Sequence, residues 1–162
     1  MLSQYEKVTQ EHLLNERLAD LLRVAANGGD IEKLKELLNN PLYNIENFMN
    51  KGDTVHEYTA LMRAAAKGHV ECYELLLNKG VRYRQVTKKG NTALMIAALN
   101  DQDKIIDKFI EIKCSLSYID DYGHSEFKTA FDNKQQKIIT AFLKKGINLK
   151  YLYQIVIFIM VA

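Results

Sequence analysis

Apolar residues in the middle of this chain recur at the spacing of short amphipathic helices. Leu61 and Ala65 fall on one face of a helix that Thr59 can open, because its hydroxyl accepts a hydrogen bond from a backbone amide two or three residues on. Gly68 is expected to end this helix, since glycine adopts the left-handed conformation without steric cost. The apolar residues within 72–77 predict a second helix that stops at the next glycine. The pattern therefore predicts a helix–turn–helix unit.

This unit repeats along the chain. The copies begin at Thr59-Ala60-Leu61-Met62, at Thr92-Ala93-Leu94-Met95 and, in degraded form, at Ser125-Glu126-Phe127-Lys128, each 33 residues after the last. An upstream copy contains Ala25-Ala26 and Gly29-Asp30, but its offset is six residues longer, and the extra length must lie between residues 40 and 59. Between units the chain must turn back through an extended hairpin. A period of this size predicts stacked helical units rather than a single-layer bundle.

The repeats resemble those of ankyrin-repeat proteins, most specifically in residues 58–69 and 80–94. The resemblance covers residues 16 to 150 and implies an all-α solenoid of stacked helix–turn–helix units with hairpin fingers. The expected repeats span about residues 16–52, 53–85, 86–118 and 119–150, within a domain of residues 1–150. Met62 and Met95 stand where the family usually has histidine, so the side-chain hydrogen bond of that histidine is expected to be absent.

Segments at both ends are expected to cover the stack. Ser3 and Glu6 fit a capping box, so residues 3–15 predict a capping helix that continues into the first repeat and shields its open side. Residues 151–162 are nearly all apolar but too few to span a bilayer, since 12 helical residues rise only about 18 Å. They either cap the fourth repeat or form a self-association surface, and both alternatives stay open.

Composition and charge argue against some classes of protein but do not identify a partner. The 162 residues carry 22 basic and 20 acidic side chains, and this net charge of +2 falls short of the strongly basic character of nucleic-acid-binding domains. Cys72 and Cys114 are too few for a disulfide framework, and the N-terminus lacks a secretory signal, so a cytoplasmic protein is expected. Pro41, the single proline, opens an elongated first finger.

The sequence contains no recognised catalytic motif, neither a phosphate-binding glycine loop nor HExxH nor GxSxG. His69 and Cys72 are three residues apart and could meet on one helix face, but the resemblance gives His69 a structural position and Cys72 faces the expected core. Asp120 and Asp121 with His124 are interpreted as turn residues rather than metal ligands. We therefore expect no catalytic residue, no metal site and no cofactor.

The family resemblance implies that the chain binds another protein, without catalysis, through its fingers and first helices. The residues at the family's variable contact positions are His56, Tyr58, Lys67, Lys88, Lys89, Asn91, Asn100, Asp121, Tyr122, His124, Asp132 and Asn133. Tyr58 and Tyr122 are the preferred anchors, because aromatic side chains dominate the energetics of interfaces.

The fingers leave alternatives open. The apolar residues of the elongated first finger, Tyr43, Ile45, Phe48 and Met49, are expected to pack on the first helices rather than touch a partner. The basic residues within 82–89 are interpreted as a solvated tip or a contact for an acidic protein, with nucleic-acid contact as a remote alternative. A host-directed effector or adaptor of an intracellular bacterium, which would recruit a host protein, is the other alternative, and it rests on composition alone.

Overall fold

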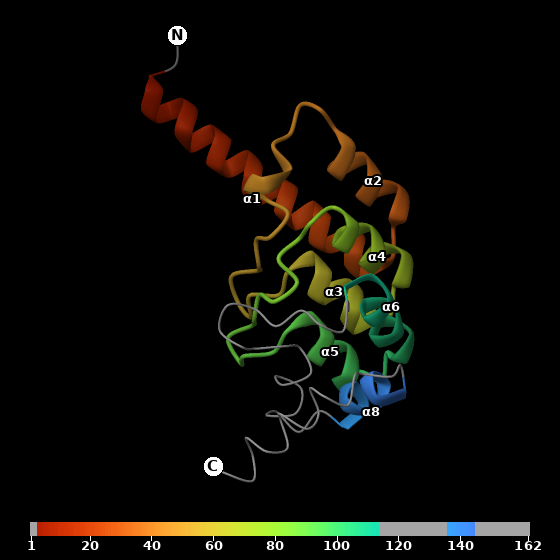
Figure 1. The fold of residues 1–162 in the computed structure, drawn as a ribbon. Coiled ribbons are helices and arrows are strands. Elements are labelled where there is room, and N and C mark those ends of the chain that lie inside the picture. The colour runs from red at the N-terminus through yellow and green to blue at the C-terminus, as the bar shows by residue number, and fades with distance from the viewer. Residues whose placement is uncertain (1–2, 114–135, 145–162) are drawn as a thin grey trace.

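The computed structural model describes residues 3–113 and 136–144, and every regular element in these ranges is a helix (Figure 1). The elements are α1 (Gln4–Gly28), α2 (Ile31–Asn39), η1 (Ile45–Asn47), α3 (Ala60–Lys67), α4 (Val70–Asn78), α5 (Ala93–Leu99), α6 (Asp103–Lys113) and α8 (Gln136–Lys144). Within these ranges, no helix is both long and apolar enough to cross a bilayer.

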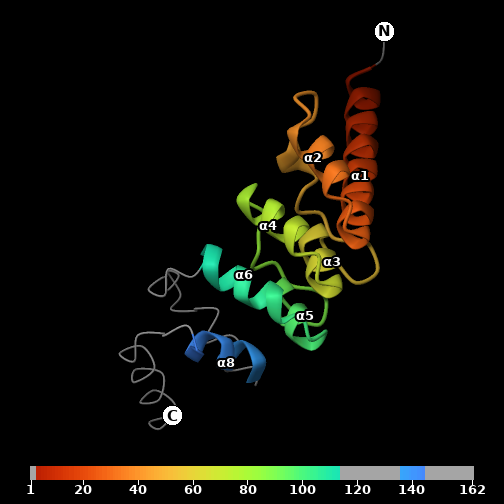
Figure 2. The same ribbon diagram turned by 90° about the vertical axis from the view of Figure 1, so that its right-hand side faces the viewer.

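Successive helix pairs form the layers of a solenoid. The first helices α1, α3 and α5 pack on one another, and the second helices α2, α4, α6 and α8 form a parallel row beside them. Figure 2 shows these layers following one another from α1 and α2 to α8. The expected all-helical solenoid of helix–turn–helix units is confirmed for the described residues. The boundaries proposed for the individual repeats stay a prediction.

Local signals set the ends of the helices as expected. The hydroxyl groups of Thr59 and Thr92 accept hydrogen bonds from the backbone amides of Met62 and Met95, both at 3.3 Å. Gly68 ends α3 in the left-handed conformation, with φ of 74°. The expectation about Met62 was wrong in one respect, because its sulfur accepts a contact from the Thr59 N–H at 3.5 Å. A thioether is a weak acceptor, but here it takes the place that a Glu or Gln side chain has in a capping box.

Small residues let the first helices approach closely, and larger ones fill the space toward the second helices. Ala26, Ala64, Ala65 and Ala97 are fully buried between α1, α3 and α5. The largest fully buried side chain, Tyr73, lies in α4. This division gives a thin seam between first helices and a thicker core behind them, which is the packing that alanine-rich helix faces favour.

The N-terminal helix differs from the expected cap. Ser3 and Glu6 form the predicted capping box, but α1 is one continuous helix whose buried residues begin only at Leu18. Residues 3–14 are all exposed, and the first turns of α1 project beyond the stack (Figure 1). The prediction that residues 3–15 shield the first repeat is therefore wrong for this structure. These residues extend past the other helices, so their apolar side chains have no surface of the stack to cover.

The elongated first finger, residues 40–59, packs on the core as predicted. Phe48 and Met49 are buried, and Tyr43 and Ile45 are half-buried against the same cluster. The ring of Tyr43 meets Phe48 edge-on, with centroids 6.4 Å apart. These contacts confirm that the extra residues of this finger add to the core.

Polar contacts tie this finger to α1. The buried guanidinium of Arg23 donates to the carbonyl oxygen of Lys51 at 2.9 Å and also pairs with Asp20. The ammonium of Lys51 in turn reaches Glu16 at 2.5 Å, and this hydrogen bond is the main reason that the pKa of Glu16 is lowered. The finger is thus held to α1 along two turns of the helix.

Several expectations fall outside the described residues. They concern the cap at Ser125, the thiol of Cys114, the turn at Asp120 and Asp121, and the role of residues 151–162. Helix α8 lies where the second helix of the fourth repeat was expected, and its Ile138 is buried.

Candidate protein-binding surface

The structure describes seven of the expected contact residues and brings the finger residues together. His56 and Tyr58 lie in the first finger, and Lys88, Lys89 and Asn91 lie in the second finger, residues 81–92. Lys67 and Asn100 are exposed at the far ends of α3 and α5, one helix length away from the fingers. The remaining expected contacts, Asp121, Tyr122, His124, Asp132 and Asn133, lie outside the described residues.

The first finger ends in a single helical turn, which we call the finger-one tip (residues 53–58). The carboxylate of Asp53 accepts hydrogen bonds from the backbone amides of Val55 at 3.1 Å and His56 at 2.7 Å, so it caps the start of this turn. The amide of Glu57 donates to the Asp53 carbonyl at 3.1 Å and closes the turn. Glu57 itself has a left-handed backbone, with φ of 61°. A side-chain cap therefore fixes an element only one turn long.

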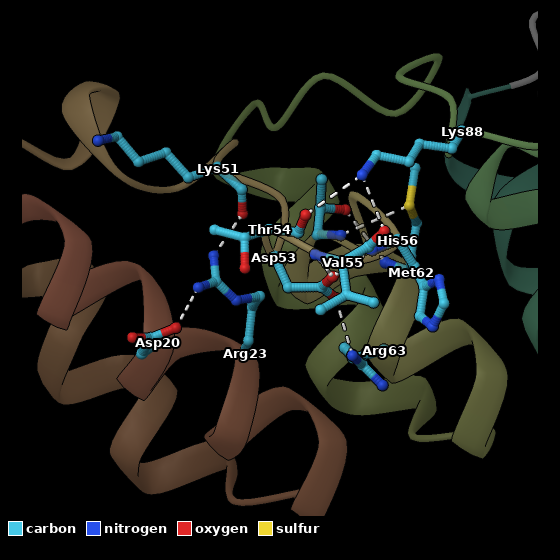
Figure 3. A network of polar contacts seen from close by, with 11 residues as sticks. Asp20, Arg23, Lys51, Asp53, Thr54, Val55, His56, Met62, Arg63 and Lys88 are labelled. Carbon is cyan, nitrogen blue, oxygen red and sulfur yellow. Dashed lines mark hydrogen bonds and ion pairs between the residues drawn. The ribbon is translucent and has the colours of Figure 1, made fainter.

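The second finger supplies the cap at the other end of this turn. The ammonium of Lys88 donates to the carbonyl oxygens of Thr54 at 3.2 Å and Val55 at 2.9 Å (Figure 3). These carbonyls are the groups that a single helical turn leaves without a partner. Lys88 therefore joins the two fingers, a role that the sequence did not predict. Its contact with a partner protein stays a prediction.

The tip is also fixed to α3 through Arg63. The Arg63 guanidinium forms an ion pair with Asp53 at 2.8 Å and lies 4.9 Å from the centre of the Tyr58 ring. His56 meets the same ring edge-on, with centroids 6.3 Å apart. Tyr58 is consequently half-buried and held between a cation and an imidazole, which sets the direction of its ring before any partner arrives.

The electrostatics of the tip favour an ionised Asp53. Burial alone would raise the pKa of this carboxyl, but hydrogen bonds from the His56 amide, the Arg63 guanidinium and the Val55 amide outweigh burial and lower it. Protonation of the carboxyl removes the charge that pairs with Arg63 and weakens all three hydrogen bonds, because bonds to a charged acceptor are the stronger ones. The order of the tip is thus linked to the charge of one side chain.

We expect acid to release the tip before it unfolds the stack. Because the folded pKa of Asp53 is lowered, the stabilisation is complete above its unfolded pKa and is lost as the pH falls through the folded value. Amide hydrogen exchange at Val55 and His56, followed from pH 7 downward, measures this loss. In an Asp53→Asn variant the protection factors of these amides, which are the exchange rates corrected for their intrinsic pH dependence, should no longer change in this pH range, and a change like that of the wild type would contradict the assignment to Asp53.

Gly52 lets the chain pass close to its own backbone beneath the tip. A Cβ at this position would lie 2.6 Å from the carbonyl oxygen of Glu57, which is backbone and cannot move without shifting the turn. Gly52→Ala is expected to destabilise the protein by about 1–3 kcal/mol, a typical cost of overpacking. Gly28→Ala is a matched control, because a Cβ there meets nothing within 4 Å. Urea denaturation compares the two, and equal midpoints would contradict the close approach.

Cys72, which was considered as a nucleophile, lies in the packed core. The thiol of Cys72 is buried, and this burial raises its pKa, so it is held as a neutral thiol rather than a reactive thiolate. The ring of His69 lies 3.0 Å from the carbonyl oxygen of Asn27 and stacks closely on Gly29 of the preceding unit. Gln102 takes the corresponding place against Gly68 one unit later. His69 and Cys72 are therefore confirmed as packing residues.

The residues that build the tip were not predicted from the sequence. Asp53 and Arg63 had no expected role, and Lys88 was expected to be solvated or to contact an acidic partner. Asp53 was within reach of sequence reasoning, because an aspartate in a turn commonly accepts a hydrogen bond from the backbone amide two residues on, which here is the amide of Val55. Within the described ranges, His, Cys, Asp and Glu side chains form no group of three or more that could hold a metal ion.

The fold and this surface define a helical repeat solenoid with paired projecting fingers, the architecture of a protein-interaction module. The chain belongs to the ankyrin-repeat family, since the model of ankyrin repeats in three copies matches residues 21–120. Members of this family are typically non-catalytic interaction modules.

Two curated proteins are similar in sequence to part of this chain. Ankyrin repeat and SAM domain-containing protein 6 of Rattus norvegicus is 39% identical over 67 residues, which are 41% of this chain and 8% of the rat protein. The Mus musculus protein of the same name is 37% identical over the same shares. The chain thus matches a small part of these curated relatives.

A solved structure covers more of the chain. One chain in the crystal structure of the yeast ribosomal protein Rps3 in complex with its chaperone Yar1 is 27% identical, with a TM-score of 0.58. The match covers 81% of this chain and 93% of the yeast chain. Similarity to a member of a protein complex agrees with an interaction module.

Proposed function

We propose that this chain binds a partner protein through the finger-one tip and the adjoining face of the second finger. One observation carries the proposal: Asp53, Arg63 and Lys88 fix the tip, while Val55 stays 63% exposed at its surface. An apolar side chain on a fixed turn loses little conformational entropy when it is covered by a partner. A packing role would require no such exposure.

The positive charge of the second finger would steer an acidic partner toward the proposed surface. Residues 81–92 contain four cations and no carboxylate, and Lys89 is exposed at the turn. Such a cluster raises the association rate of an acidic partner more than its final affinity. We expect Lys89→Glu to slow association in stopped-flow measurements at low salt. An unchanged rate would contradict electrostatic steering.

The nucleic-acid alternative receives less support from the same cations. Lys88 is engaged with two backbone carbonyls, and the Arg84 guanidinium lies 5.5 Å from the centre of the Tyr83 ring. An adaptor or host-directed effector would use the same surface, so these roles differ from the proposal only in the identity of the partner. Capture from a eukaryotic and from a bacterial lysate distinguishes them.

A matched pair of variants tests the proposed surface. Val55→Glu introduces a charge at the tip, and Leu42→Glu introduces the same charge at a residue of the same finger that is 85% exposed but lies off the tip. A protein captured from lysate by the wild type and by Leu42→Glu, but not by Val55→Glu, would support the tip as the binding site. Capture that is equal for all three proteins would overturn it.

A further inference from the structure

Helix α1 has two apolar faces, and the stack buries only one of them. Leu18 and Leu22 face the core, whereas Leu14 and Leu21 are 46% exposed and Val24 is 69% exposed. Leu14, Arg17, Leu21 and Val24 follow one another at alternating steps of three and four residues, so they form one continuous line along the helix. We call this line the outer stripe of α1.

The outer stripe lies on an outer face of the described stack, where no described element covers it. An apolar face of this kind is normally covered, because it would otherwise be left in water. The first eleven residues of α1 also project beyond the stack without support, and a free helix of that length is marginal in water. Both features are explained if another helix covers α1.

We propose that the outer stripe pairs with the outer stripe of a second copy of this chain, in antiparallel orientation. The spacing is that of one helix in a coiled coil, and its antiparallel register is self-complementary. Leu14 then lies opposite Val24 of the second copy, and Arg17 lies opposite Leu21. Gln10 falls opposite Gly28 of the second copy, where no side chain hinders the approach. One surface therefore suffices to build a closed two-fold dimer.

Charge selects the antiparallel arrangement. Arg17 is exposed and forms no ion pair within the described residues, and Asp20 pairs with Arg23 through one oxygen while its side chain remains largely exposed. In a parallel pair the Arg17 side chains of the two copies would face each other, and their like charges would repel. In the antiparallel pair each Arg17 lies beside Asp20 of the other copy, so the two contacts are attractive. One attractive contact thus lies on each side of the two-fold axis.

Paired cysteines in the full-length chain test the register. In the proposed dimer, Leu14→Cys combined with Val24→Cys places each new thiol opposite the other in the second copy. Within one chain these positions are about 15 Å apart along the helix, too far for a disulfide. We expect the double variant to give a covalent dimer under mild oxidation, while each single variant stays monomeric on a non-reducing gel. Cross-linking of Leu14→Cys alone would indicate parallel pairing and overturn the proposal.

Sedimentation over a range of concentrations tests the surface itself. The wild type is expected to form a concentration-dependent dimer, and Leu14→Glu with Leu21→Glu is expected to remove it while helix content is retained. Leu42→Glu, which lies off the stripe, should leave it unchanged. A wild-type chain that remains monomeric would overturn the proposal, as would a dimer that survives the stripe variant and disappears only when residues 151–162 are deleted.

Discussion

Replacement of Phe48 by alanine is expected to lower the free energy of unfolding by about 3–5 kcal/mol, the usual cost of removing a buried aromatic side chain. Phe48 is 1% exposed and packs against the half-buried ring of Tyr43. It lies five residues before Asp53, so we expect its loss to loosen the segment that leads into the finger-one tip. We expect the tip to become mobile even under conditions in which the rest of the stack stays folded.

Leu42→Ala is the control for this prediction, because Leu42 belongs to the same finger but is largely exposed, and such substitutions usually change stability by less than about 0.5 kcal/mol. Chemical denaturation gives the loss of stability, and amide exchange at Val55 and His56 reports the tip. If Phe48→Ala behaved like Leu42→Ala in both measurements, the finger would not depend on its buried aromatic residue.

The parts of the fold that could be predicted from the sequence are encoded within a few residues. The hydroxyl of Thr59 reaches an amide three residues away, and Gly68 ends the same helix by its own backbone preference. The regular recurrence of these signals fixed the order of the helices. Burial of Cys72 followed from its place on the apolar face, and the structure confirms it.

The parts that could not be predicted depend on contacts between distant residues. Lys88 caps carbonyls more than thirty positions earlier in the chain, and nothing in its neighbours indicates which backbone it will meet. The exposed start of α1 failed as a predicted cap for a related reason: an apolar pattern shows that a helix face needs a partner but does not identify the partner. In the candidate site, the sequence located His56 and Tyr58, while the residues that orient them came from the structure.

The two proposed interaction surfaces, the fingers and the outer stripe of α1, lie on different parts of the chain. The tip is fixed through Arg63 and Lys88, which the expected boundaries assign to the second and third repeats, whereas the stripe lies on the first helix of the stack. A variant at Val55 is therefore expected to leave dimer formation unchanged, and a variant at Leu21 is expected to leave the tip intact. The two proposals can consequently fail independently.

Replacement of Leu76 by alanine is expected to destabilise the middle of the stack by about 2–5 kcal/mol, as for other buried leucines. Leu76 is fully buried in α4, which packs between α2 and α6. In a repeat solenoid the units are held by contacts with their neighbours, so a weak central unit separates the two ends from each other. We expect the single unfolding transition to divide into two, with a smaller dependence on denaturant for each.

Asn78→Ala is the control variant in the same helix, because Asn78 is exposed at the last turn of α4. Urea titrations followed by circular dichroism give the slope and midpoint of each transition, and a lowered slope with unchanged native helix content would indicate separate unfolding of the ends. A lowered midpoint with an unchanged slope would contradict the division, because the stack would then still unfold as one unit. Since α1 packs on α3, the end that carries the outer stripe should be the part that uncouples from α5 and α6.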